Sequence, residues 1–235
     1  MSTEHTEHTE QSSPLSPSDG AAPAQREREP WISLLLYRLF KWSMVIPTFR
    51  FYFRGRVHRP QQYLERGRLI VVANHASDFD PPFVGATFGR PVAFMAKEEL
   101  FRVPGLGKFI SLYGAYPVRR GSVDRRALKA AAERIREGWA VGIFLDGTRT
   151  SDGRLHNPRL GAAFLAAQTQ SPLVPVSVWG TDKISKEGSA FPQSVPVTIR
   201  IGEPIAPPRS TDRADLEAVT KICVDAVHAL HDLGR

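Results

Sequence analysis

Two side chains that can move a proton together lie close in the sequence, within the segment from residue 74 to residue 82. His75 and Asp80 are separated by four residues. Imidazole has an unperturbed pKa near ~6.5 and accepts a proton near neutral pH. A carboxylate beside it fixes the tautomer of the ring and stabilises its charged form. If the loop turns back on itself, the two residues form a general base and its orienting partner.

A structural role for the same residues is the alternative. Asp80 is followed by Pro81, an order typical of a helix with an aspartate at its N-cap and a proline at its first position. His75 would then be a hydrogen-bonded loop residue. A His-x4-Asp spacing is short, and taken alone it favours this structural role.

Two further segments carry groups that can hold phosphate. In the segment 144–150, Gly147 permits a tight turn, Thr148 offers a hydroxyl, and Arg149 can grip phosphate through two parallel hydrogen bonds. The segment 116–121 carries the adjacent arginines Arg119 and Arg120. The alternative is a plain turn and solvated arginines, unless the fold brings Arg120 near Arg149.

These segments need elements to position them, and from residue 68 onward short apolar runs alternate with helical stretches. The pattern predicts strands at 69–73, 92–96, 116–118, 140–145, 173–179 and 197–201, and helices at 124–137, 160–169 and 212–233. Such alternation predicts an α/β layered domain with a mixed, partly parallel sheet flanked by helices. Ligands bind at the carboxyl ends of strands in sheets of this kind, and the segments of His75 and Arg149 both follow predicted strands.

The composition is that of a globular protein. Of the 235 residues 42% are hydrophobic and 23% are charged. The one cysteine, Cys223, excludes an intrachain disulfide and fits a reducing compartment; its helical apolar surroundings place it in the core. Residues 1–29 are polar and rich in proline and serine, which predicts a disordered tail, and no secretion signal is recognised there.

The net charge of +7 indicates an anionic partner, and its distribution favours a lipid surface. Residues 30–64 lack acidic residues but mix arginine and lysine with aromatic rings, a composition that suits the headgroup layer of a bilayer. Pro47 and two cations interrupt the apolar run before the roughly 18 residues of a spanning helix. We therefore expect 30–55 to contain a helix lying in the interface, with Ile32, Leu35, Leu36, Leu39 and Phe40 on one face and Arg38 and Lys41 opposite. An amphipathic helix packed on the domain is the alternative.

Together the motifs resemble the lysophospholipid acyltransferase family, best known for 1-acylglycerol-3-phosphate acyltransferases. The resemblance runs from about residue 56 to residue 204. The family's first block, Asn-His-x-Ser-x-x-Asp, is matched in full by Asn74, His75, Ser77 and Asp80. The stretch 95–107 is also similar to the family, and the later blocks are matched at 114–120 with Arg120 at the position of the family arginine, at 144–149, and at 173–176. Four blocks in order are more specific than any one of them, so they favour the catalytic interpretation of His75.

The resemblance implies direct transfer of a fatty acyl group from acyl-CoA or acyl carrier protein to a lysophospholipid hydroxyl, without a metal or redox cofactor. It implies a glycerolphosphate acyltransferase-like fold over residues 56–235, and a protein attached peripherally to the cytoplasmic face of a membrane. His75 would take the hydroxyl proton and Asp80 would hold the ring. The residues implied to bind substrate are Asn74, Ser77, Lys97, Arg120, Asp146, Gly147, Thr148 and Arg149.

The third block departs from the family pattern Phe-Pro-Glu-Gly-Thr-Arg-Ser, because Leu145, Asp146 and Thr150 replace its proline, glutamate and serine. Asp146 keeps the charge but reaches less far by one methylene group. The acceptor therefore stays open between 1-acylglycerol-3-phosphate and another lysolipid or a glycolipid.

Three other functions are weaker interpretations. The segment Leu145-Asp-Gly-Thr148 is similar to a phosphatase motif, but Phe144 occupies the place of the nucleophilic aspartate. A non-enzymatic lipid-binding protein would have no need of the intact His75/Asp80 pair. Nucleic-acid binding is not expected, because the basic segment lies among apolar aromatic residues and no known reader motif is present.

Overall fold

The structure is a computed structural model that describes residues 31–60, 67–105, 107, 110–111, 114–118, 125–185 and 191–235. Its centre is a seven-stranded sheet with the strand order β1-β7-β6-β2-β5-β3-β4. All neighbouring strands are parallel except β6 and β7. The strands are β1 (Arg56–His58), β2 (Ile70–Ala73), β3 (Val92–Lys97), β4 (Tyr116–Val118), β5 (Ala140–Phe144), β6 (Leu173–Trp179) and β7 (Thr198–Ile201). The expected mixed, partly parallel sheet is confirmed.

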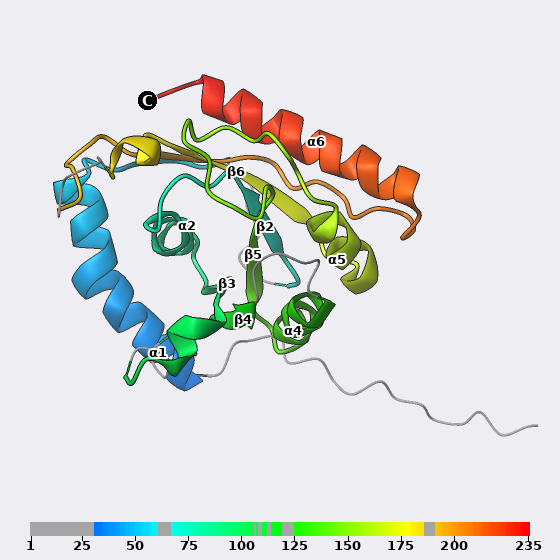
Figure 1. Ribbon diagram of the computed structural model, residues 1–235, viewed down its shortest axis with the longest axis horizontal. Helices are drawn as coiled ribbons and strands as arrows, with labels where there is room; N and C mark the ends of the chain where they lie inside the picture. Colours follow the sequence, from blue (N-terminus) through cyan, green and yellow to red (C-terminus); the bar gives the residue numbers. More distant parts are fainter. Residues whose placement is uncertain are drawn as a thin grey trace, which may run out of the picture.

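Helices cover both faces of this sheet (Figure 1). One face carries α1 (Trp31–Phe40) and α2 (Asp80–Thr87); the other carries α4 (Arg125–Arg136), α5 (Gly161–Thr169) and α6 (Arg213–Asp232). Two π-helical segments, Lys41–Val45 and Thr48–Tyr52, extend α1, and short 3-10 helices lie at Glu98–Arg102 and Thr181–Lys183.

Strand β2 shows why the sheet has two cores. Its four residues are all buried, and successive side chains of a strand point to opposite faces. Val71 and Ala73 pack with the α2 side, whereas Ile70 and Val72 pack with α4, α5 and α6. Each layer of helices is thereby fixed to the strand that ends just before His75.

The predicted strands and helices agree with the observed bounds to within one residue at each end. Besides the short 3-10 helices, one strand and one α-helix of the described residues were not predicted. Strand β1 is only three residues long, with two of them exposed, and it forms by parallel pairing with β7, as in the pair Val57 and Ile199. Helix α2 begins at Asp80, where only an N-cap had been considered.

The expected faces of the N-terminal helix are confirmed for Lys41 and wrong for Arg38. Tyr37 and Lys41, one turn apart, face the domain: the Tyr37 hydroxyl donates to the carbonyl of Gly85, and Lys41 Nζ donates to that of Phe88 at 2.8 Å. These carbonyls lie at the end of α2, where the last carbonyls of a helix lack their usual donors from the next turn. Lys41 therefore points inward, and burial, with Arg59 and Arg38 nearby, lowers its pKa to about 8.

The outer side of the same helix is apolar. Leu35 and Leu39 are 61% and 65% exposed, and Trp42 is 66% exposed. Arg38, expected on the opposite face, lines the same surface groove as these residues. Within the described part of the chain, no helix is long and apolar enough to cross a bilayer. The predicted disordered tail, residues 1–29, lies outside the described residues.

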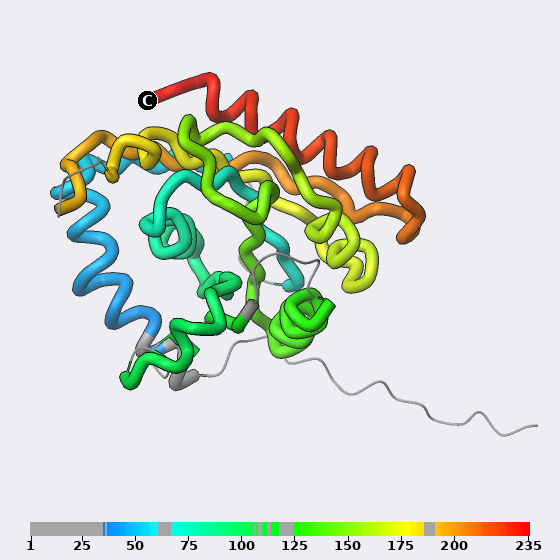
Figure 2. The backbone as a smooth tube through the Cα atoms, viewed as in Figure 1, coloured from blue at the N-terminus to red at the C-terminus, as the bar shows by residue number. Residues whose placement is uncertain are grey.

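The end of this N-terminal segment is held by the segment near residue 194. Tyr52 donates to the carbonyl of Pro192 at 2.6 Å, and the Val197 amide donates to the carbonyl of Phe53 at 3.0 Å. Figure 2 shows the two segments side by side, far apart in colour and therefore in sequence. The helix and the far edge of the sheet are thus one unit.

Candidate active site

The loop between β2 and α2 closes around one carboxylate oxygen. Asp80 Oδ2 accepts from His75 Nδ1 at 2.8 Å, from the Ala76 amide at 2.7 Å and from the Ser77 amide at 2.8 Å. Asp80 is fully buried at the first turn of α2, where the positive end of the helix dipole favours a carboxylate. Its side chain makes no N-cap bond to its own helix. The loop turns back on itself, which is the condition for a base and its orienting partner.

The contact also sets the tautomer of His75. An ionised carboxylate only accepts hydrogen bonds, so in the neutral imidazole Nδ1 carries the proton and Nε2 keeps its lone pair. The His75 side chain is 12% exposed. Nε2 is thus the ring atom that can accept a proton from a bound hydroxyl.

Two residues that were not assigned from the sequence also hold His75. The ring of Phe144, the last residue of β5, stacks on the imidazole with centroids 3.9 Å apart and planes 13° from parallel. Thr150 donates to the His75 carbonyl from its amide at 2.8 Å and from its hydroxyl at 3.2 Å. Both residues belong to the segment 144–150, which was read only for phosphate binding.

Asn74 and Ser77, both expected to bind substrate, use their polar groups within the protein. The buried Asn74 amide donates to the carbonyls of Gly153 and Val178 at 2.6 and 2.8 Å, and its oxygen accepts from the Val178 amide at 2.8 Å. The Ser77 hydroxyl accepts from the Phe79 amide at 3.3 Å. Asn74 therefore ties the end of β2 to β6.

The segment after β5 divides into an inward and an outward part. Asp146 is buried, and its two oxygens accept from the amides of His156 at 2.9 Å and Asn157 at 3.1 Å. Gly147 has a φ of +67°, a left-handed conformation that glycine adopts without strain. The carboxylate of Asp146 thus closes the loop that follows it, and the turn at Gly147 carries the chain outward.

The outward part carries a cation next to the His75 loop. Thr148 and Arg149 are exposed, and Arg149 Nη1 bonds Asp78 Oδ2 at 2.6 Å. Lys97 is exposed at the carboxyl end of β3, on the same edge of the parallel strands. Arg120 lies outside the described residues, so its expected proximity to Arg149 stays a prediction.

Other reactive groups are few within the described ranges. No cluster of three or more His, Cys, Asp or Glu side chains there could hold a metal ion. Cys223, a residue of α6, is buried in the core as expected, and burial raises the pKa of its thiol to about 12.

In comparisons with known proteins, the chain is similar to acyltransferases. The model of the family described as Acyltransferase matches residues 54–179. The 1-acyl-sn-glycerol-3-phosphate acyltransferase of Borreliella burgdorferi is 27% identical over 166 residues, which are 69% of this chain and 66% of that protein. The human 1-acyl-sn-glycerol-3-phosphate acyltransferase beta is 28% identical over 183 residues, 76% of this chain and 66% of that protein.

A chloroplastic 1-acyl-sn-glycerol-3-phosphate acyltransferase of Brassica napus is 36% identical over 124 residues, 51% of this chain. This match spans 35% of the length of the plant protein. Among solved structures, the 1-acyl-sn-glycerophosphate acyltransferase PlsC from Thermotoga maritima superposes with a TM-score of 0.60 at 28% identity. The superposition covers 85% of this chain and 78% of that one.

Proposed function

The chain belongs to the acyltransferase family, and on that premise we propose that it is an O-acyltransferase that esterifies the free hydroxyl of a lysophospholipid. The proposed acceptor is 1-acylglycerol-3-phosphate and the product phosphatidate, as the names of the relatives indicate. The observation that carries the proposal is the 2.8 Å contact between His75 Nδ1 and the buried Asp80 carboxylate. It leaves Nε2 free to act as a base at the carboxyl edge of the sheet.

The proposed reaction is a direct transfer from a thioester. His75 Nε2 removes the proton of the acceptor hydroxyl while the oxygen bonds to the thioester carbonyl carbon. The tetrahedral intermediate then collapses, the carbon–sulfur bond breaks, and the thiol leaves with the proton from the imidazolium. Asp80 stabilises that imidazolium. Acyl-CoA and acyl carrier protein present the same thioester, so either can be the donor, and the proposal involves no metal or redox cofactor.

Arg149 is the proposed partner of the acceptor phosphate, with the turn at Gly147 and Thr148 beside it. Its ion pair with Asp78 is exposed, the two side chains being 41% and 80% accessible. Exposed pairs contribute only about 0–1 kcal/mol, so a phosphate can replace the Asp78 carboxylate on the guanidinium at small cost. Lys97 and Arg120 complete the proposed set.

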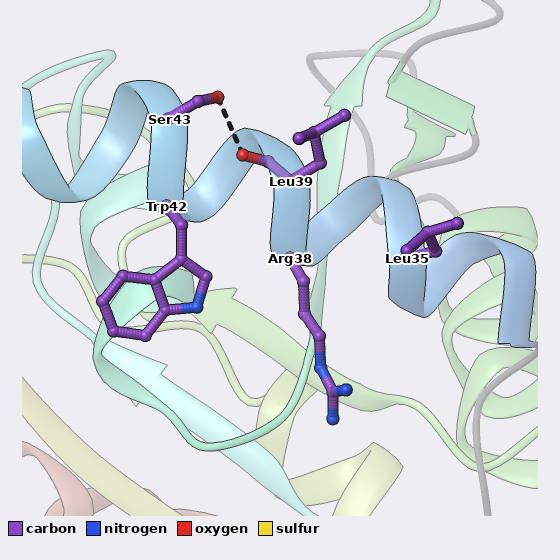
Figure 3. A pocket seen from close by; sticks show the side chains of 5 residues that line it. All are labelled: Leu35, Arg38, Leu39, Trp42 and Ser43. Atoms are coloured by element: carbon purple, nitrogen blue, oxygen red, sulfur yellow. Dashed lines mark hydrogen bonds between the residues drawn. The ribbon is translucent and has the colours of Figure 1, made fainter.

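We also propose that the protein meets its lipid substrate at the cytoplasmic face of a membrane. The groove on the outer side of α1 and the following turn is lined by Leu35, Arg38, Leu39, Trp42 and Ser43 (Figure 3). An exposed apolar surface next to a cation suits the boundary between acyl chains and anionic headgroups. The exposed face of α1 is therefore the proposed contact with the bilayer.

The reaction is tested by a product screen. Purified protein is given acyl-CoA or acyl-loaded carrier protein with a panel of lysolipids and glycolipids, and lipid products are identified by mass spectrometry. His75→Ala should lower kcat at least ~100-fold, the usual contribution of a positioned general base. The matched control is His156→Ala, since His156 forms an exposed pair with Asp152 at 3.0 Å. Full activity of His75→Ala would rule out the proposed base, and a preferred acceptor other than lysophosphatidate would correct the substrate.

The membrane contact is tested by co-sedimentation with vesicles of phosphatidylcholine and phosphatidylglycerol. A triple variant, Leu35→Ser, Leu39→Ser and Trp42→Ser, should bind at least ~10-fold more weakly, because the apolar area available for insertion is lost. Ile222→Ser, which changes an exposed apolar residue on α6, serves as the control. Equal binding of the triple variant and the control would contradict the proposed surface.

A further inference from the structure

We propose that Phe144 is a positioning residue for the catalytic imidazole, acting through a stack of three rings, His75, Phe144 and Phe94, that is built over Gly142. The inference deepens the proposed function, on which it rests insofar as His75 is the general base. It concerns how the ring plane of His75 is fixed.

The stack runs from the site into the core. The rings of His75 and Phe144 lie 3.9 Å apart at 13°, and those of Phe144 and Phe94 lie 5.4 Å apart at 22°. Phe94 is 8% exposed and belongs to the buried cluster on the α2 side of the sheet. Because each ring is nearly parallel to the next, the packed core determines the orientation of the outermost ring, which is the imidazole.

A single hydrogen bond does not fix the plane of a ring. The bond from Nδ1 to Asp80 Oδ2 holds one ring atom at 2.8 Å, but the imidazole could still swing about that bond. Such a swing would move Nε2 away from the acceptor hydroxyl. A flat aromatic surface against one face of the imidazole blocks the motion. Asp80 and Phe144 therefore supply complementary constraints, and proton transfer depends on geometry held within a fraction of an ångström.

The neighbouring strands bring these rings together. Phe144 pairs with Ala73, two residues before His75, and Phe94 pairs with Gly142. Gly142 and Phe144 lie on the same face of β5, because side chains two residues apart in a strand point the same way.

Gly142 is required for the third ring. A Cβ atom added there would lie 2.1 Å from Cε1 of Phe94, closer than atoms can approach. A side chain at position 142 would displace Phe94, which would remove the support behind Phe144. Glycine at this strand position, which otherwise weakens a strand, is thus explained by the stack.

The test compares variants that keep or remove the ring at position 144. Phe144→Leu keeps an apolar side chain and should lower kcat about tenfold with KM for both substrates within about twofold, because binding is unchanged and only the orientation of the base is lost. Phe144→Tyr restores the ring and should recover at least about half of the wild-type kcat. Phe88→Leu, at a buried position of the same core, is the matched control and should lower the melting temperature without the loss in kcat.

A second measurement does not depend on turnover. In spectra of protein with ¹⁵N-labelled histidine, the hydrogen-bonded Nδ1 proton of His75 should be visible in the wild type and in Phe144→Tyr, and broadened or lost in Phe144→Leu. If no acyl transfer is found for any acceptor, this measurement still decides the inference. Wild-type kcat and an unchanged spectrum in Phe144→Leu would overturn it, as would a loss of kcat that Phe88→Leu shares.

Discussion

Replacing Asp80 by asparagine isolates the charge of the carboxylate that holds His75. Three donors converge on Oδ2, whereas Oδ1 has no hydrogen-bond partner among the described residues. An asparagine can place its amide oxygen at the position of Oδ2 and its NH2 group at that of Oδ1, so all three hydrogen bonds are kept. The substitution therefore preserves the loop and removes the negative charge.

The size of the effect follows from the 2.8 Å contact with the imidazole. For unit charges at this distance, an effective dielectric constant of about 20 gives roughly 6 kcal/mol of attraction between the carboxylate and the imidazolium. This corresponds to about four orders of magnitude in rate. The dipole of the amide recovers part of it, so we expect kcat to fall between ~100-fold and ~10,000-fold, with KM changed by less than about threefold.

The assay is formation of the esterified lipid, followed by mass spectrometry under saturating donor and acceptor. Asp152→Asn is the matched control, because Asp152 pairs with His156 at 3.0 Å at the surface; its kcat should stay within about twofold. In Asp80→Asn the new NH2 group is buried without an acceptor and should lower the melting temperature, so activity is compared well below both transitions. A kcat within about fivefold of the wild type would refute the role of the charge.

Three further predictions concern buried residues. Asn74→Ala leaves the Val178 amide and two buried carbonyls without their partner. It should lower the free energy of unfolding in urea by about 2–4 kcal/mol, and a loss no larger than that of the exposed Asn157→Ala would contradict this. Cys223 should react with Ellman's reagent only on unfolding, because burial raises the pKa of its thiol to about 12; rapid labelling of the native protein would disprove it. Burial, with Arg154 nearby, lowers the pKa of His231, so the unfolded chain takes up a proton that the folded protein does not. Stability should then fall as the pH drops below about 6.5, and the loss should be smaller in His231→Gln; equal pH dependence in both proteins would refute the assignment.

The sequence predicted those strands whose own residues indicate a strand. Leu173–Trp179 and Ile70–Ala73 are buried runs rich in β-branched residues, and such runs indicate strands without knowledge of their neighbours. Arg56–His58 has no such run, because the strand exists only through its pairing with β7. The side of the N-terminal helix on which Arg38 lies was predicted wrongly, because a helical pattern does not show which side of the helix the rest of the domain covers.

The candidate site could also be predicted only where its contacts are local in the sequence. The contact of His75 with Asp80 is local, since one loop closes on itself, and a motif of seven residues contains both partners. The stacking of Phe144 depends on the pairing of β2 with β5, which joins residues about 70 positions apart. The inward direction of the Asp146 side chain likewise depends on amides ten and eleven residues further on. Motif matching identifies the residues that carry the chemical groups. The directions in which their side chains point are set by the tertiary structure.

The bonds between Tyr52 and Pro192, and between β1 and β7, join segments that the ribosome synthesises at different times. The two bonded residues are 140 positions apart. The C-terminal end of the N-terminal helical segment is therefore held by residues that a ribosome adds much later. At the usual 5–20 residues per second, the delay is on the order of ten seconds. During that interval Tyr52 has left the ribosome, while the residues that will hold it have not yet been synthesised. A nascent chain of this protein therefore carries the apolar outer face of α1 before the end of its helical segment is anchored, so a chaperone or a lipid surface can engage that face early.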